Sequence, residues 1–146
     1  MDVPSRHDGP VRECVFCAIV RDEAAADVVL RDEVAVAFLD RSPLFAGHVL
    51  VVPTEHVVTL PELLNVGPFF ERVQRVVAAI PTALGAQGTF VANNNVVSQS
   101  VAHLHVHVVP RTKGDGLRGF FWPRRKYADG EAAAVASRLR AALDGR

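Results

Sequence analysis

The chain has 146 residues, 49% of them hydrophobic and 22% charged, which is typical of a globular protein with one sizeable core. Its 16 basic and 16 acidic residues balance, which excludes a general polyanion-binding surface, so no nucleic-acid partner is expected. No apolar run reaches the roughly 18 residues that a membrane span needs, and the N-terminus holds no apolar signal core. Two cysteines are too few for a disulfide scaffold, so we expect a cytoplasmic protein without membrane association.

The first half of the chain is expected to contain a tail, a short helix and three strands. Residues 1–12 are polar and predict a flexible tail, whereas residues 13–146 predict a single domain. Apolar spacing predicts a short helix over 14–23. β-Branched stretches predict a hairpin and a further strand, the latter ended by Pro53; these strands are expected over 28–30, 34–39 and 48–52.

The second half is expected to contain two helices and two strands. Residues 65–80 form the clearest helical pattern, because apolar residues recur every three or four positions, and Pro81 and Gly85 are expected to end it. Strands are predicted over 89–92 and 103–109, the second ended by Pro110, and a last helix over 131–143. The mixture predicts an α+β fold with a mainly antiparallel sheet and one long helix.

Three histidines alternate with apolar residues in the strand predicted over 103–109. Because alternate residues of a strand share a face, His103, His105 and His107 are expected side by side, about 7 Å apart, with Leu104 behind them in the core. Three interpretations are open. The histidines form an exposed strand face, a metal site, or a nucleophilic site in which neutral imidazole attacks phosphorus.

The pair Cys14-x-x-Cys17 near the N-terminus is ambiguous when taken alone. A thioredoxin-like redox motif would follow a strand inside a βαβ pattern, which the sequence does not clearly show. Zinc would need two further ligands. The third interpretation is a reduced pair that packs as small apolar side chains.

The segment HLHVHVVPR resembles the signature of the histidine triad (HIT) family, in which three histidines alternate with apolar residues. The blocks CVFCAIV, AFLDRSPLFAGHVLVVPTEH and NNNVVSQS resemble the same family in the same order. The resemblance covers nearly the whole chain and is nearest to the small bacterial, Hint-like members. It implies a HIT-like fold over residues 13–146 and a two-fold homodimer, with helix 65–80 and strand 89–92 as the expected dimer surfaces.

The resemblance also implies a function. Such proteins bind purine mononucleotides (AMP or GMP) and cleave at the α-phosphate of AMP phosphoramidates, acyl adenylates or dinucleoside polyphosphates through a nucleotidyl-histidine intermediate, with no catalytic metal. The sequence does not select between adenine and guanine. The alternatives are a non-catalytic nucleotide-binding regulatory module and a metalloenzyme with the three histidines around one metal.

Individual roles follow from the same resemblance. His105 corresponds to the nucleophile, His107 to the histidine that contacts the α-phosphate, and His103 to a supporting residue. Asp40 corresponds to the residue whose carboxylate accepts hydrogen bonds from the ribose hydroxyls. The remaining nucleotide-binding positions comprise the phosphate side, at Asn94, Gln99 and Ser100, and the apolar slot for the base, at Val15, Phe16, Ile19 and Phe38.

A structural zinc is implied as well. In several bacterial HIT proteins, and in the related galactose-1-phosphate uridylyltransferases, two cysteines and two histidines at matching places bind zinc. The matching residues here are Cys14, Cys17, His56 and His103. His48 is expected either to support the triad or simply to start a strand.

One segment departs from the family pattern. The loop NNNVVSQSV lacks the glycines that many relatives carry before the triad, and Ser98 stands in place of one of them. Because glycine permits positive φ and close backbone approach, this difference puts the phosphate-loop geometry in question.

Overall fold

The computed structural model describes residues 14–117 and 123–145. The tail predicted over 1–12 lies outside the described residues, as do the aromatic residues 120–122. The chain divides into two compact units, one ending at Lys113 and the other beginning at Gly114. Among the described helices, none is long and apolar enough to cross a membrane.

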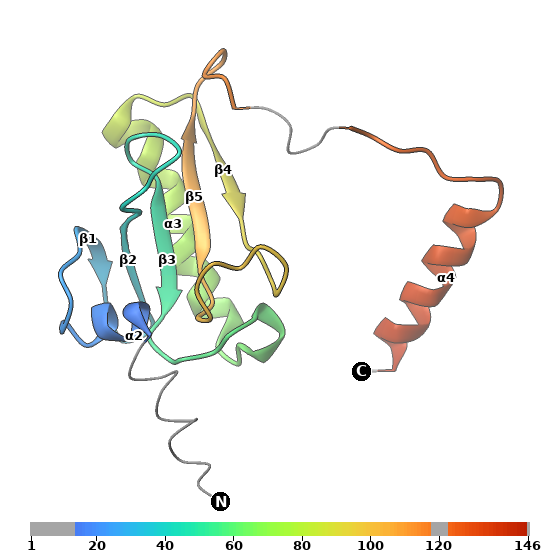
Figure 1. Cartoon of the computed structure of the whole chain (residues 1–146), viewed down its shortest axis with the longest axis horizontal. Coiled ribbons are helices and arrows are strands. Elements are labelled where there is room, and N and C mark those ends of the chain that lie inside the picture. The colour runs from blue at the N-terminus through green and yellow to red at the C-terminus, as the bar shows by residue number, and fades with distance from the viewer. Residues whose placement is uncertain (1–13, 118–122, 146) are drawn as a thin grey trace, which may run out of the picture. The chain divides into compact units, whose positions relative to one another are not determined.

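The first unit is built on a five-stranded antiparallel sheet with the order β1-β2-β3-β5-β4 (Figure 1). The first two strands form the predicted hairpin, and β4 lies at one edge beside β5. The strands are β1 (Val28–Arg31), β2 (Ala35–Leu39), β3 (Val49–Pro53), β4 (Gly88–Ala92) and β5 (Val106–Arg111).

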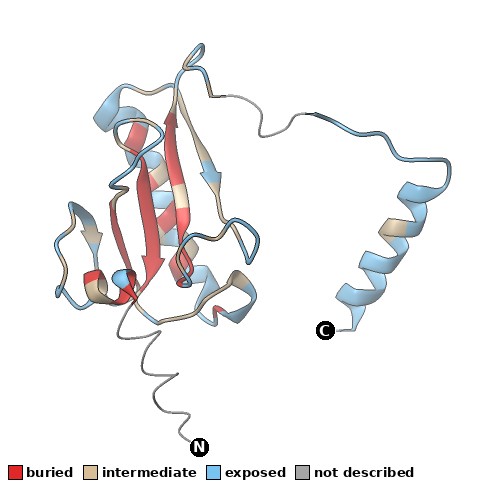
Figure 2. Ribbon diagram, in the orientation of Figure 1, coloured by how far each residue is buried: buried red, intermediate tan, exposed pale blue. Residues whose placement is uncertain are grey.

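Both faces of the central strands are buried, because their side chains alternate between two apolar clusters (Figure 2). On one face, Ala37, Val51 and Val106 pack with the long helix α3 (Val66–Leu84), whose buried residues include Phe69 and Val73. On the other face, strand residues pack with the short helix α2 (Val15–Val20), and a 3₁₀ turn η1 (Leu60–Glu62) precedes α3. The α+β architecture with one long helix is confirmed.

The strand predicted over 103–109 is shifted toward the C-terminus. It begins only at Val106, so the predicted strand start at residue 103 is wrong. The predicted alternation still holds, because Leu104 lies in the core on the α3 side, whereas the rings of His103 and His105 contact Phe16 of α2 and the ring of His107 lies 5.1 Å from that of His105. The backbone of this segment has other partners. The Leu104 N–H donates to the Val57 carbonyl at 2.7 Å, and the Asn93 side chain donates to the His105 carbonyl at 2.9 Å.

Two prolines that were expected to end elements lie inside them. Helix α3 continues past Pro81 to Leu84, and Gly85, at φ 71°, closes it by donating its N–H to the Pro81 carbonyl. Strand β5 continues through Pro110 to Arg111. The ladder between β3 and β5 stops at Val108, so Pro110 lies beyond the part of β5 that has neighbours on both sides.

In the second unit, residues 114–117 and 123–145 are described and include one helix, α4 (Glu131–Asp144), none of whose side chains is buried. It begins after Gly130, whose φ is 77°. The Glu131 carboxylate accepts a hydrogen bond from the Ala128 N–H at 2.8 Å, which ties the turn before the helix to its first residue.

Candidate functional site

A cavity of about 190 Å³ opens beside the ends of β2 and β5, on the α2 side of the sheet. It contains two of the three predicted catalytic histidines and six of the eight predicted nucleotide-binding residues. These are His105, His107, Val15, Phe16, Ile19, Phe38, Asp40 and Ser100. Residues from four separate stretches of sequence therefore meet at one apolar slot with a polar end.

The ring of His105 is fixed by its own backbone neighbour. Its Nδ1 lies 2.8 Å from the carbonyl oxygen of His103, and because a carbonyl only accepts hydrogen bonds, Nδ1 carries the proton. In the neutral ring the lone pair is then on Nε2. The ring is buried between Phe16 and His107, with a centroid distance of 5.1 Å to each. His105 therefore offers one unprotonated nitrogen in a fixed position.

The ring of His107 is held in the opposite tautomer. The Leu44 N–H donates to His48 Nδ1 at 3.0 Å, so the proton of neutral His48 is on Nε2. That nitrogen lies 2.9 Å from His107 Nδ1 and donates to it, which leaves the proton of His107 on Nε2. The site thus combines an acceptor nitrogen on His105 with a donor nitrogen on His107.

Burial keeps the imidazoles of His107 and His48 neutral. Desolvation, followed by the neighbouring His105 and His48, lowers the pKa of His107 to about 4, although Asp40 opposes the shift. Desolvation also lowers the pKa of His48, again against the effect of Asp40. At neutral pH the rings of His107 and His48 are therefore uncharged, which suits hydrogen bonding better than general attraction of anions.

The two carboxylate oxygens of Asp40 have different neighbours, one in the turn after β2 and one beside the histidines of the cavity. Its Oδ1 accepts from the Ser42 N–H at 2.9 Å, which is an Asx turn after β2. Its Oδ2 lies 3.7 Å from His48 Nε2, so one carboxylate oxygen faces the histidines. The exposed side chain of Arg41 lines the same cavity, a feature that the sequence did not indicate.

The predicted residues Asn94 and Gln99 are not part of the cavity lining. The Asn94 side chain donates to the Ser98 carbonyl at 3.2 Å, and Gln99 spans the loop by donating to Val58 and accepting from the Val96 N–H. The asparagine that reaches the triad is Asn93, which donates to the His105 carbonyl. A side-chain bond between residues 12 apart leaves no signal in a single sequence.

The loop before the triad adopts glycine-like backbone without glycine. Ser98 has φ 64° and Val96 has φ 75°. Positive φ is unfavourable for most side chains and especially for a β-branched one. The loop therefore holds two residues in the left-handed region that favours glycine, at a cost in conformational strain.

The four predicted zinc ligands form a second cluster beside the cavity. Their ligand atoms all lie within 4.8 Å of one another. His103 Nδ1 lies 3.4 Å from Cys14 Sγ, 3.5 Å from Cys17 Sγ and 3.2 Å from His56 Nδ1, and His56 Nδ1 lies 3.0 Å from Cys17 Sγ. Ligands of tetrahedral zinc lie roughly 3.3–3.8 Å apart, so two thiols and two imidazoles fit this ion.

The protonation of the cluster also suits a metal. His103 Nε2 lies 3.0 Å from the Pro53 carbonyl and donates to it, which leaves Nδ1 free to face the cysteines. Desolvation lowers the pKa of His103 to about 4 and so keeps its ring neutral. Burial and the neighbouring Cys14 raise the pKa of the Cys17 thiol to about 11, so a metal would displace a proton from it.

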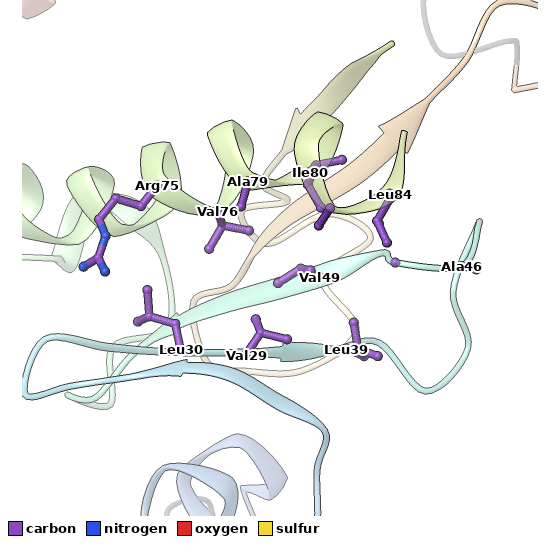
Figure 3. Close-up of a pocket in the computed structure, with 12 residues that line it drawn as sticks. Val29, Leu30, Leu39, Ala46, Val49, Arg75, Val76, Ala79, Ile80 and Leu84 are labelled. Carbon is purple, nitrogen blue, oxygen red and sulfur yellow. The ribbon is translucent and has the colours of Figure 1, made fainter. Parts of the chain in front are cut away.

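A larger cavity, of about 570 Å³, lies between α3 and strands β1 to β3 (Figure 3). Its lining is apolar except for Arg75, and none of the predicted site residues belongs to it. The groups that can carry out chemistry are thus in the smaller cavity.

Similar proteins were found by sequence and by structure. A model of the HIT domain matches residues 21–114. An uncharacterized HIT-like protein of Methanocaldococcus jannaschii is 40% identical over 107 residues, which are 70% of this chain and 82% of that protein. An adenosine 5'-monophosphoramidase of Schizosaccharomyces pombe is 28% identical over 128 residues, 86% of this chain and 95% of that protein.

A solved structure extends the comparison. The crystal structure of a zinc-bound histidine triad family protein from Mycobacterium smegmatis is similar with a TM-score of 0.69 and 36% identity. The similarity covers 92% of this chain and 97% of that one. The chain therefore belongs to the histidine triad (HIT) family, as its HLHVHVVPR segment predicted.

Proposed function

We propose that this chain is a nucleotide hydrolase or nucleotidyl transferase that cleaves at the α-phosphate of a purine nucleotide. One observation carries the proposal: the hydrogen bonds of the two rings leave Nε2 of neutral His105 as an acceptor and Nε2–H of neutral His107 as a donor, and both residues line one cavity. A nucleophile next to a donor is the arrangement that displacement at phosphorus needs. The adenosine 5'-monophosphoramidase among its relatives supports this reaction class.

The reaction would proceed in two displacements. His105 Nε2 attacks the α-phosphorus and forms a P–N bond while the bond to the leaving group breaks; that group (an amine, acyl group, phosphate or nucleotide) departs with the bonding electrons, and a basic leaving group takes a proton from solvent. Water or another hydroxyl acceptor then attacks phosphorus and releases a proton to solvent, the P–N bond breaks, and the His105 lone pair is restored. The His107 Nε2–H would donate to a phosphate oxygen as negative charge develops.

The rest of the cavity would orient the nucleotide. The apolar side chains of Phe16, Ile19 and Phe38 would hold the base. The carboxylate of Asp40 would accept hydrogen bonds from the ribose hydroxyls. The volume of about 190 Å³ is below the roughly 300–1,000 Å³ of a whole-ligand pocket. The base would therefore be enclosed, with the phosphate and leaving group at the open end.

We also propose that zinc binds Cys14, Cys17, His56 and His103, supported by the compact Cys₂His₂ cluster and by the zinc-bound relative. The ion would supply structural cross-linking rather than a reacting group, since all four coordination positions are filled by side chains. A metal assay should find about one zinc per chain, lost in Cys14→Ser and retained in His105→Ala. Loss in His105→Ala instead would favour a metal held by the triad.

We also propose that two copies of the chain form a homodimer through the β4 edge of the sheet. Within the part of the chain that the structure describes, β4 has a strand neighbour only on its β5 side, and Val91 on it is 44% exposed. An exposed strand edge is a surface for pairing with another chain. A second copy pairing through β4 would extend the sheet across a two-fold axis.

The decisive experiment compares wild type with His105→Ala on an AMP phosphoramidate. Turnover should be lost while AMP binding, measured by calorimetry, remains. Rapid mixing with substrate followed by mass spectrometry should detect a nucleotidyl adduct on wild-type His105. Persistent turnover in the variant would show that the nucleophile is another group, and binding without turnover or adduct in wild type would identify a non-catalytic nucleotide-binding module.

A further inference from the structure

The metal cluster and the nucleotide cavity share one short helix. Cys14 is the N-cap of α2 and Cys17 lies in its first turn, whereas Phe16 and Ile19 between and after them line the cavity. A helix of six residues is far too short to be stable on its own. Its position therefore depends on its packing against the sheet and on what holds its two ends.

The two ends of α2 are held differently. At the C-terminal end, the Arg31 guanidinium donates to the carbonyls of Val20 and Ile19, at 2.8 and 3.1 Å. At the N-terminal end, Cys14 and Cys17 meet His56 and His103. Within the helix, Cys14 accepts from the Cys17 N–H through its Sγ at 3.3 Å and from the Ala18 N–H through its carbonyl at 3.1 Å. A metal would fix the N-terminal end, which carries Phe16.

His103 forms a second link between the two sites. Its ring faces the cysteines, and its carbonyl oxygen accepts the proton that sets the tautomer of His105. The ring of Phe16 contacts both rings edge-on, with centroid distances of 6.0 Å to His103 and 5.1 Å to His105. A shift of His103 would thus move both the nucleophile and one wall of the base slot.

We propose that metal at the Cys₂His₂ cluster and nucleotide in the neighbouring cavity bind with positive coupling, each raising the affinity for the other. The proposal rests on the proposed nucleotide-binding function. A filled metal site holds α2 and His103 where the nucleotide needs them, so a nucleotide bound to metal-free protein must order them itself. Because coupling free energy is reciprocal, the effect on the two affinities must be the same factor.

The first experiment measures AMP affinity by calorimetry for zinc-loaded protein and for protein made metal-free with a chelator. Circular dichroism selects conditions in which the metal-free chain remains folded. We expect AMP to bind the zinc-loaded form about 5- to 150-fold more tightly. Equal affinities would overturn the inference and leave the proposed function intact, whereas no AMP binding to either form would overturn both.

The second experiment measures the effect of AMP on zinc affinity and starts from zinc-loaded protein. Zinc affinity is determined by competition with a chromogenic chelator, with and without saturating AMP. AMP should lower the zinc Kd by the factor found in the first experiment, and an unchanged zinc Kd would overturn the inference.

Two variants separate coupling from general stabilisation of the fold. Phe16→Leu keeps an apolar side chain in the slot but removes the ring that contacts His103 and His105. The ratio of AMP affinities between zinc-loaded and metal-free protein, the coupling factor, should therefore fall while zinc still binds. Asp40→Asn, at the end of β2, should weaken AMP binding in both metal states and leave the factor unchanged. A factor that persists in Phe16→Leu would exclude α2 as the connection.

Discussion

His48 Nε2 donates a hydrogen bond to His107 Nδ1 across 2.9 Å, between residues 59 apart in the sequence. Since His48 Nδ1 accepts from the Leu44 N–H, the direction of this bond is fixed by the backbone. The proton of His107 is thereby directed to the nitrogen that would meet the phosphate. This relationship makes His48 a positioning residue for the proposed reaction.

Replacement of His48 by alanine should lower kcat about fivefold, because one neutral hydrogen bond contributes about 1 kcal/mol and about 1.4 kcal/mol corresponds to a factor of ten. The Kd for AMP should change little, since His48 does not line the cavity. His48→Gln should recover part of kcat, because its amide N–H can still donate to His107. Equal losses in both variants would show that His48 acts only through stability, which thermal unfolding measures separately.

The free energy of unfolding should decrease as the pH falls from about 6.5 to 4. In that range the unfolded chain protonates histidines at an ordinary pKa near 6.5, whereas burial holds the pKa of His107 at about 4 in the folded chain. The unfolded state then binds more protons, so stability rises with pH through this window and is complete above it.

Denaturant unfolding of wild type and His107→Gln at pH 7 and pH 5 isolates this contribution. Wild type should lose about 1 kcal/mol more than the variant between the two values, a figure reduced because His107 is partly exposed and water screens the shift. Parallel losses in the two proteins would show that His107 titrates normally in the folded state.

The sequence predicted which residues form the sites better than it predicted their arrangement. Cys14, Cys17, His56 and His103 converge as expected, as do most cavity residues, because the order of the sequence blocks carries the family fold. The period-two pattern of HLHVHVV also predicted a strand correctly for its second half. The extent of that strand depends on partners that the pattern does not encode.

The missed features depend on contacts between distant segments. The backbone of residues 103–105 bonds to Val57 and Asn93 instead of joining a ladder. Asn93 contributes through a single side-chain hydrogen bond to the triad and belongs to no local period or spacing. For His48 the sequence left two roles open, and the contact with His107 supports the first, support of the triad. Helix and strand signals are local, and these arrangements are set by tertiary packing.

The asparagines before the triad should differ in importance. Asn93→Ala removes the donor to the His105 carbonyl and should destabilise the protein by about 1 kcal/mol and lower kcat. Asn94→Ala is the matched control, because its bond to the Ser98 carbonyl stays within the exposed loop. Denaturant unfolding and steady-state kinetics of both variants test this. A larger kcat loss in Asn94→Ala would instead support the role that the family resemblance implies for Asn94.

Glycine at position 96 should stabilise the protein although it removes a side chain. Val96 has φ 75°, which costs a β-branched residue about 1–2 kcal/mol or more, and glycine would relieve this strain while adding roughly 0.5–1 kcal/mol of unfolded-state entropy. The next residue provides the control, because Val97 is 78% exposed, like Val96 at 75%, but has no positive φ. Val96→Gly should therefore raise the free energy of unfolding by about 1 kcal/mol, and Val97→Gly should lower it by roughly 0.5–1 kcal/mol. If both variants lose stability equally in denaturant unfolding, the loop holds no strain at Val96, and the absence of glycine before the triad has no energetic cost there.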